Sequence, residues 1–126
     1  MSAPDANQPI TIFIVDDEPL LLDLAKSVLG SSNFSVRTFR DPKKALLEYA
    51  TAMPDVVVTD YAMTDMNGMD LTRECRRINP RQKILLISGT VDESIFADEP
   101  VKPDLFLAKP YQIREFVETI QKLAKC

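Results

Sequence analysis

Short runs of apolar, often β-branched residues alternate along this chain with longer amphipathic stretches. The short runs predict five strands: Ile10–Asp16, Phe34–Phe39, Asp55–Asp60, Lys83–Ser88 and Asp104–Ala108. The third run, DVVVTD, is apolar on both faces. Such a strand belongs inside a parallel sheet that is covered on both sides.

The stretches between these strands predict helices whose ends carry typical capping residues. Pro19 suits the first turn of a helix, and Gly30 stands where that helix should stop. Asp41 and Pro42 provide an N-cap and a first turn for a second helix, which runs to about Ala52. Two further helices are predicted over Gly68–Ile78 and about Tyr111–Lys125.

The segment between the fourth and fifth strands departs from this regular alternation. Residues 90–93 read TVDE, which has the spacing of a capping box. Pro100 and Pro103 follow, and proline lacks the amide hydrogen and clashes with the preceding turn of a helix. A helix that starts near Val91 therefore ends by about Glu99. The sequence predicts a shortened or irregular fourth helix.

The alternation of strands and helices predicts an α/β fold with a parallel sheet and helices on both faces. Right-handed crossovers leave few topologies, and the doubly wound, flavodoxin-like strand order 2-1-3-4-5 is common at this size. The 126 residues suffice for one such domain. Residues 1–8 are polar and contain proline, so we expect a flexible tail followed by one domain over residues 9–126.

The composition excludes several kinds of function. The chain has no histidine, which rules out a Ser-His-Asp triad, a Cys-His pair and a zinc site built on histidine. Its three glycines are too few for the glycine-rich phosphate loops of nucleotide-binding proteins. The net charge of −4 argues against binding to nucleic acid, and no segment has the pattern of a membrane span or a signal peptide.

The cysteines and a basic cluster have simple interpretations. Cys75 and Cys126 do not make a disulfide framework, so both are expected to be reduced thiols of a cytoplasmic protein. Five basic residues are expected to be solvated surface: Arg73, Arg76, Arg77, Arg81 and Lys83.

Polar residues gather at the carboxyl ends of the predicted strands, where open α/β sheets bind ligands. Asp16 and Asp17 end the first strand and Asp60 the third. Ser88 ends the fourth, and Lys109 follows the fifth. Close carboxylates raise one another's pKa, and a divalent cation relieves that repulsion. Oxygen ligands without histidine or cysteine suit Mg²⁺, which often bridges carboxylates to a phosphate.

This arrangement predicts a phosphoryl-transfer site. With a metal present, Asp60 can act as a nucleophile toward phosphorus, while Lys109 and Ser88 each contact a phosphoryl oxygen. Each of these residues alone is a weak signal, because Asp, Ser-Gly and Lys-Pro are common in ordinary turns. Their joint placement at four strand ends carries the prediction.

The motifs around these residues resemble those of receiver domains of two-component response regulators. The matching motifs, within about residues 9–125, are VDDEP, VVVTDYAMTDMNGMDL, ILLISG and FLAKP. The resemblance implies that Asp16, Asp17 and Asp60 hold Mg²⁺, with Mn²⁺ as the alternative metal, and that Asp60 is the phosphoacceptor. It also assigns Ser88 and Lys109 to contacts with the phosphoryl group.

Further roles follow from the same resemblance. Ala62 would give its backbone carbonyl to the metal, and Pro110 would follow a cis peptide bond. Phe106, three residues before Lys109, matches the aromatic switch position, whose side chain would turn inward as Ser88 moves toward the phosphate. An aromatic residue in an apolar strand is equally well explained as part of the core.

Two features depart from the family pattern. Thr64 stands where the family usually has a proline, which should loosen loop 61–67 without removing a ligand. Pro100 and Pro103 fall where the family normally has a regular fourth helix, which is part of its usual signalling surface.

The resemblance also implies partners. The phosphoryl donor would be phosphohistidine on a sensor histidine kinase or on a histidine phosphotransfer protein. The chain would catalyse its own phosphorylation and dephosphorylation, without being an enzyme in the usual sense. Its signal would pass to a downstream protein target or to a C-terminal output domain that is absent from this chain. A homodimer formed on phosphorylation is left open.

Two other functions stay open on the sequence alone. A phosphatase or mutase of the haloacid-dehalogenase kind would also use an aspartate nucleophile. That family carries D-x-D-x-T after its first strand, whereas here Asp16 and Asp17 are adjacent and Pro19 follows. The second alternative is an interaction module that is never phosphorylated, in which the acids only cap helices.

Overall fold

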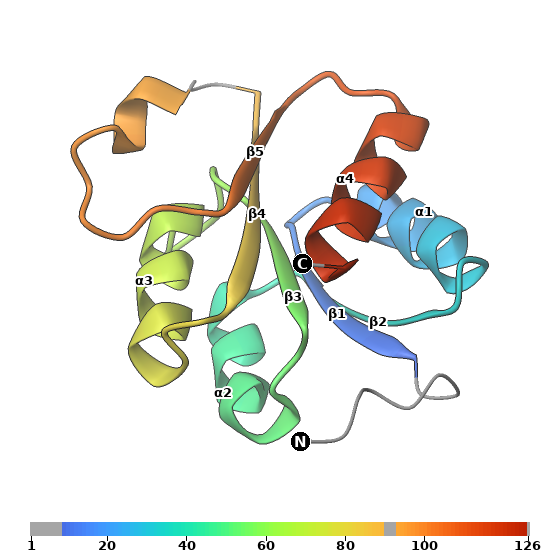
Figure 1. Ribbon diagram of the computed structural model, residues 1–126, viewed down its shortest axis with the longest axis horizontal. Helices are drawn as coiled ribbons and strands as arrows, with labels where there is room; N and C mark the ends of the chain where they lie inside the picture. Colours follow the sequence, from blue (N-terminus) through green and yellow to red (C-terminus); the bar gives the residue numbers. More distant parts are fainter. Residues whose placement is uncertain (1–8, 90–92, 126) are drawn as a thin grey trace.

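A parallel sheet with helices on both faces forms the core of the protein (Figure 1). The computed structural model describes residues 9–89 and 93–125. The strands are β1 (Ile10–Val15), β2 (Phe34–Phe39), β3 (Val56–Asp60), β4 (Lys83–Ser88) and β5 (Leu105–Ala108). The helical elements are α1 (Pro19–Gly30), α2 (Pro42–Ala52), α3 (Gly68–Ile78), α4 (Ile113–Lys125) and the 3₁₀ turn η1 (Glu93–Phe96).

The strand order is β2-β1-β3-β4-β5, and every pair is parallel. The predicted doubly wound, flavodoxin-like fold is therefore confirmed. The proposed tail at residues 1–8, the first three residues of the TVDE motif (90–92) and Cys126 lie outside the described residues. None of the described helices is long and apolar enough to cross a membrane.

Side chains alternate across the sheet and so divide the core into two layers. Ile12 and Ile14 of β1 point toward α1 and α4, together with Val56 and Val58 of β3. Phe13 of β1 points the other way, into a layer covered by α2 and α3 (Figure 1). Every residue of β3 is buried, which explains why that strand is apolar on both faces.

Local hydrogen bonds explain where the helices begin. The Asp41 carboxylate accepts a 2.9 Å hydrogen bond from the amide of Lys43 at the start of α2. At the start of α3, Asn67 and Asp70 form a reciprocal capping box. Helix α1 has no side-chain cap at Glu18. Its first turn is tied to the end of β1 because the Glu18 amide donates to Asp16 Oδ1 at 3.0 Å.

Three predicted strands prove one residue shorter in the structure. Asp16, Asp55 and Asp104 lie just outside β1, β3 and β5, although each backbone amide still donates to a neighbouring strand, to Phe39, Thr11 and Ile84 respectively. The last helix also begins at Ile113 and not at Tyr111. The sequence also predicts a shortened helix between β4 and β5. This is confirmed, since the described part of the segment between these strands contains a single 3₁₀ turn, η1.

Arg76 corrects the interpretation of the basic cluster as solvated surface. Only 17% of its side chain is exposed. The guanidinium donates to the carbonyl oxygens of Gln82 at 2.7 Å and Lys102 at 3.0 Å. It also pairs with the Asp104 carboxylate at 2.8 Å. Arg76 therefore joins α3 to the segment that leads into β5.

Gly68 opens α3 against the end of β3, where no larger residue fits. A Cβ at this position would lie 2.5 Å from the Asp60 carbonyl oxygen and 2.6 Å from Leu86 Cδ1. We expect Gly68→Ala to destabilise the domain by about 1–3 kcal/mol, because backbone or buried core must move. At Gly30 a Cβ would meet nothing within 4 Å, so Gly30→Ala should stabilise by about 0.5–1 kcal/mol.

Chemical denaturation of the two glycine variants beside the wild type measures both effects. Opposite signs are expected. A Gly68→Ala variant as stable as the wild type would contradict the close packing described here.

Candidate functional site

Three carboxylates converge at the carboxyl ends of β1 and β3. Asp16, Asp17 and Asp60 each offer an oxygen, and these oxygens lie within 4.8 Å of one another. Asp16 is 3% exposed and Asp60 8%, whereas Asp17 is open to solvent. Strands β1 and β3 pair directly, and the crossovers leave them in opposite directions along the sheet. The acids thus occupy the switch point where such sheets bind ligands.

Lys109 brings one positive charge to this cluster from the end of β5. Its Nζ lies 3.5 Å from Asp60 Oδ2 and 3.7 Å from Asp16 Oδ2. The backbone amide of Lys109 donates to the Ser88 carbonyl oxygen at 2.9 Å. This hydrogen bond holds Lys109, directly after β5, against the end of β4. One ammonium against three carboxylates leaves the site with excess negative charge.

Burial dominates the ionisation of the two inner acids. It raises the pKa of Asp16 to about 6, against the hydrogen bond from the Glu18 amide, and the negative charge of Asp60 adds to the rise. Burial likewise raises the pKa of Asp60, while Lys109 lowers it. Full ionisation of the carboxylates is therefore unfavourable in the metal-free site, and a bound cation would make that ionisation more favourable.

The donor set fits Mg²⁺. Asp16, Asp17 and Asp60 offer oxygen only, and the exposed side of Asp17 leaves room for the waters that Mg²⁺ retains. Mn²⁺ accepts the same oxygen ligands. Ala62 is exposed in the loop after β3, and its backbone carbonyl is the fourth ligand that the family resemblance implies.

Binding of Mg²⁺ is expected to weaken as the pH falls through about 6, because the Asp16 pKa lies there and a protonated carboxyl is a poor ligand. Below that pH the affinity should fall by about tenfold for each pH unit and each proton displaced. Titration of Mg²⁺ by calorimetry between pH 5 and pH 8 measures the slope. Asp16→Asn is the matched control and should reduce the slope, leaving the contribution of Asp60. An affinity independent of pH in the wild type would count against Asp16 as a ligand.

The remaining predicted residues surround the acid cluster. Ser88 is buried at the end of β4, one residue beyond Ile87, which pairs with Asp60. The peptide bond between Lys109 and Pro110, for which the family resemblance implies a cis form, is cis. Phe106 pairs with Leu86 across the β4–β5 ladder and is partly buried.

Tyr111 contributes to the site and was missed by the sequence reasoning. Its ring stacks on Phe116 with centroids 5.3 Å apart. Its hydroxyl is buried and has no hydrogen-bond partner among the described residues. Burial raises the pKa of Tyr111 to about 12, with the negative charge of Asp16 as the next cause. The available signal was its position directly after Lys109-Pro110.

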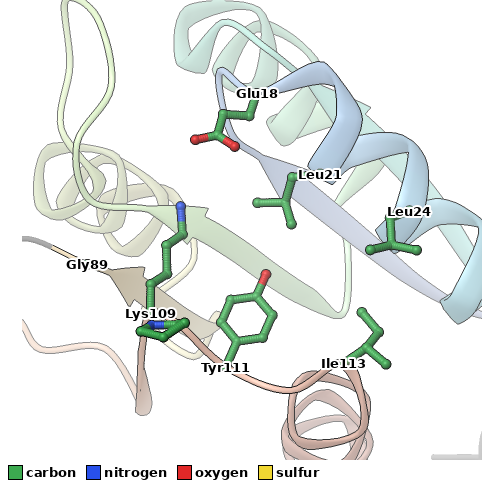
Figure 2. A pocket seen from close by; sticks show the side chains of 8 residues that line it. Glu18, Leu21, Leu24, Gly89, Lys109, Tyr111 and Ile113 are labelled. Carbon is green, nitrogen blue, oxygen red and sulfur yellow. The ribbon is translucent and has the colours of Figure 1, made fainter.

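A pocket extends from the site between α1 and α4. Figure 2 shows Leu21 and Leu24 of α1 facing Tyr111 and Ile113 across it, with Glu18 and Lys109 at the end nearer the acids. The Tyr111 hydroxyl points toward α1 in this view. Lys109 both lines this pocket and contacts the acids, and 25% of its side chain is exposed.

A doubly wound sheet of this order, with buried acids, a lysine and a serine at one edge, defines the receiver class of signalling domains. The model of the family described as response regulator receiver domain matches residues 12–121. The chain belongs to this family and is a receiver domain of two-component signal transduction.

Individual relatives agree with this assignment. The chain is 32% identical over 120 residues to the probable transcriptional regulatory protein TcrX of Mycobacterium tuberculosis, covering 94% of this chain and 51% of TcrX. It is 28% identical to the chemotaxis protein CheY of Thermotoga maritima, covering 90% of this chain and 97% of CheY. The chain thus spans about half of one relative and nearly all of the other.

Solved structures show the same fold. The crystal structure of a response regulator receiver domain protein from Clostridium thermocellum superposes with a TM-score of 0.82 at 26% identity. The match covers 91% of this chain and 94% of that one. A CheY-like receiver domain protein from Methanospirillum hungatei, at 23% identity, shares the fold with a TM-score of 0.85.

Proposed function

We propose that the domain accepts a phosphoryl group on Asp60 in a Mg²⁺-dependent reaction and signals through the resulting change of conformation. One observation carries the proposal. The Lys109 ammonium lies within 3.7 Å of two buried carboxylates whose ionisation is disfavoured in the metal-free protein. A cation bound at such a site would offset the charge of the carboxylates and so allow a negatively charged phosphoryl group to bind beside them.

The residues divide the chemistry among them. A carboxylate oxygen of Asp60 attacks phosphorus, the P–N bond of a phosphohistidine donor breaks, and the leaving nitrogen keeps the electron pair and takes a proton. The Tyr61 amide holds Asp60 Oδ1 at 3.0 Å, which fixes the orientation of the nucleophile. Lys109 and Ser88 stabilise negative charge on the phosphoryl oxygens. Bound Mg²⁺ would neutralise charge on the phosphoryl group and on the acids.

The donor lies outside this chain because the chain has no histidine. A sensor histidine kinase or a histidine phosphotransfer protein suits the chemistry. The output is a separate protein target or a C-terminal domain, since relatives of both lengths exist. A cytoplasmic location suits such partners.

Phosphorylation by a small donor tests the proposal. Incubation with acetyl phosphate and Mg²⁺, followed by intact-mass measurement, should show a gain of one phosphoryl group that is lost in EDTA. Peptide mapping should place it at Asp60. No gain, together with no binding of Mg²⁺ at about millimolar concentration, would favour the interaction module that is never phosphorylated. Membership of the receiver family sets aside the haloacid-dehalogenase alternative.

A further inference from the structure

Phe96 pins the irregular segment before β5 to the body of the domain. It lies in η1 and is only 7% exposed, although Ser94 and Ala97 beside it are exposed. Its side chain packs with Met69 of α3 and Leu86 of β4. Among the side chains described between residues 94 and 104, Phe96 is the only buried one.

Phe96 and Phe106 share the same apolar cluster. Their ring centroids are 5.8 Å apart with the planes tilted by 55°. Phe106 packs at the partly buried edge of the cluster, whereas Phe96 takes the buried place beside Leu86. Ser88 lies two residues beyond Leu86 on the same face of β4. Because interiors are close-packed, Phe106 cannot turn toward Ser88 unless another group yields.

The far end of the segment is held independently of Phe96. Arg76 binds the Lys102 carbonyl oxygen and the Asp104 carboxylate. Asp104 Oδ2 also accepts a 2.7 Å hydrogen bond from the Ile84 amide. The chain is thus fastened to α3 and β4 at residues 102–104, whatever happens at the η1 end.

The stretch between these two anchors is weakly attached. Ala97, Asp98 and Pro100 are exposed. Glu99 lies 3.6 Å from the Arg73 guanidinium, but both side chains are well exposed, so the pair contributes little. The η1 end can therefore leave the cluster while the β5 end stays in place.

We propose that Phe96 is a positioning residue that holds the domain in its unphosphorylated state by occupying the place into which Phe106 turns. The proposal rests on the proposed function, and it identifies Phe96 as the side chain whose displacement follows phosphorylation. When Ser88 moves toward the phosphoryl group, Phe106 turns from the edge of the cluster into the place of Phe96, and Phe96 leaves. The coupling is reciprocal, so loss of Phe96 packing must strengthen binding at Asp60.

Beryllium fluoride with Mg²⁺, a mimic of the phosphoryl group, provides the test. Phe96→Ala is expected to bind it about tenfold more tightly than the wild type, within the usual range of such couplings. Phe96→Leu, which keeps an apolar side chain, should show a smaller gain. Phe34→Leu is the matched control, because Phe34 packs on the opposite side of the sheet at the start of β2. It should lower stability without changing this affinity.

Hydrogen exchange provides a second measurement on the full chain. Binding of beryllium fluoride to the wild type should speed exchange at residues 93–99 and leave residues 102–104 unchanged. Phe106→Ala should remove that response. An affinity of Phe96→Ala within twofold of the wild type would overturn the proposal, as would unchanged exchange in a wild type that binds the mimic. A wild type that neither binds the mimic nor accepts phosphate would overturn the proposed function itself.

Discussion

Asp60→Asn is expected to abolish acceptance of the phosphoryl group while making the metal-free fold more stable. The amide is not a nucleophile toward phosphorus, and no other carboxylate at this edge has both the Tyr61 amide and the Lys109 ammonium as partners among the described residues. Intact mass after treatment with acetyl phosphate should show no addition at all. Thermal unfolding in EDTA should show a higher melting temperature.

The sign of the stability effect follows from ionisation. Burial raises the pKa of Asp60 in the folded state above its ordinary value of 3.8. The folded state therefore holds the proton more tightly than the unfolded state, and the penalty for folding appears as the pH rises through the folded pKa. The gain from Asp60→Asn should vanish below about pH 3.8 and should grow as the pH rises above that value toward the folded-state pKa.

Asp65→Asn is the matched control for this experiment. Asp65 is exposed in the loop between β3 and α3, a few residues after Asp60, and its φ of 73° is one that asparagine adopts readily. This variant should be phosphorylated like the wild type. A phosphoryl group that still appears on Asp60→Asn would move the acceptor to another residue, and Asp16 would be the first to map.

Lys109→Gln should slow phosphorylation by about 100-fold, the usual cost of removing one group that stabilises developing charge. It should also destabilise the metal-free fold at pH 7.5. The Lys109 ammonium lowers the pKa of both Asp16 and Asp60, so its loss leaves two buried carboxylates less compensated. The rate comes from quenched time courses with acetyl phosphate, and the stability from denaturation in EDTA.

Asp60→Asn is expected to stabilise the metal-free fold and Lys109→Gln to destabilise it, so the double variant tests whether the two residues interact. In Asp60→Asn/Lys109→Gln, loss of the lysine should cost less than it does in the wild type, because one of its two partners is gone. Lys44→Gln, an exposed change on α2, should leave both rate and stability unchanged. A Lys109→Gln variant phosphorylated at the normal rate would refute the role given to the ammonium.

The sequence predicts the acids and the lysine well for a topological reason. Parallel strands end at one edge of a sheet, so residues that directly follow predicted strands meet there whatever their separation along the chain. Asp16, Asp60 and Lys109 needed only the strand positions. One-residue errors at Asp55 and Asp104 did no harm, because those residues keep hydrogen bonds to the neighbouring strand.

Other parts of the site depend on side-chain contacts that periodicity does not encode. Phe96 precedes two prolines in a segment without a repeating pattern, so nothing marked it as buried. Arg76 looked like one more surface charge until the fold brought Asp104 and two carbonyl groups within its reach. The Asn67–Asp70 capping box was likewise visible only in the structure, because many such pairs in sequences never form one.

The exposed stretch beside Phe96 has a practical consequence for optical measurement. The chain contains no tryptophan, so an indole placed at Ala97 would be its one strong ultraviolet emitter. Ala97 is exposed and adjoins a ring that packs against both α3 and β4. The fluorescence of a tryptophan there would change as the contact of Phe96 with α3 and β4 became exposed to solvent, without a dye or a partner protein. This signal could serve as a readout in screens for compounds that stabilise either state of the domain.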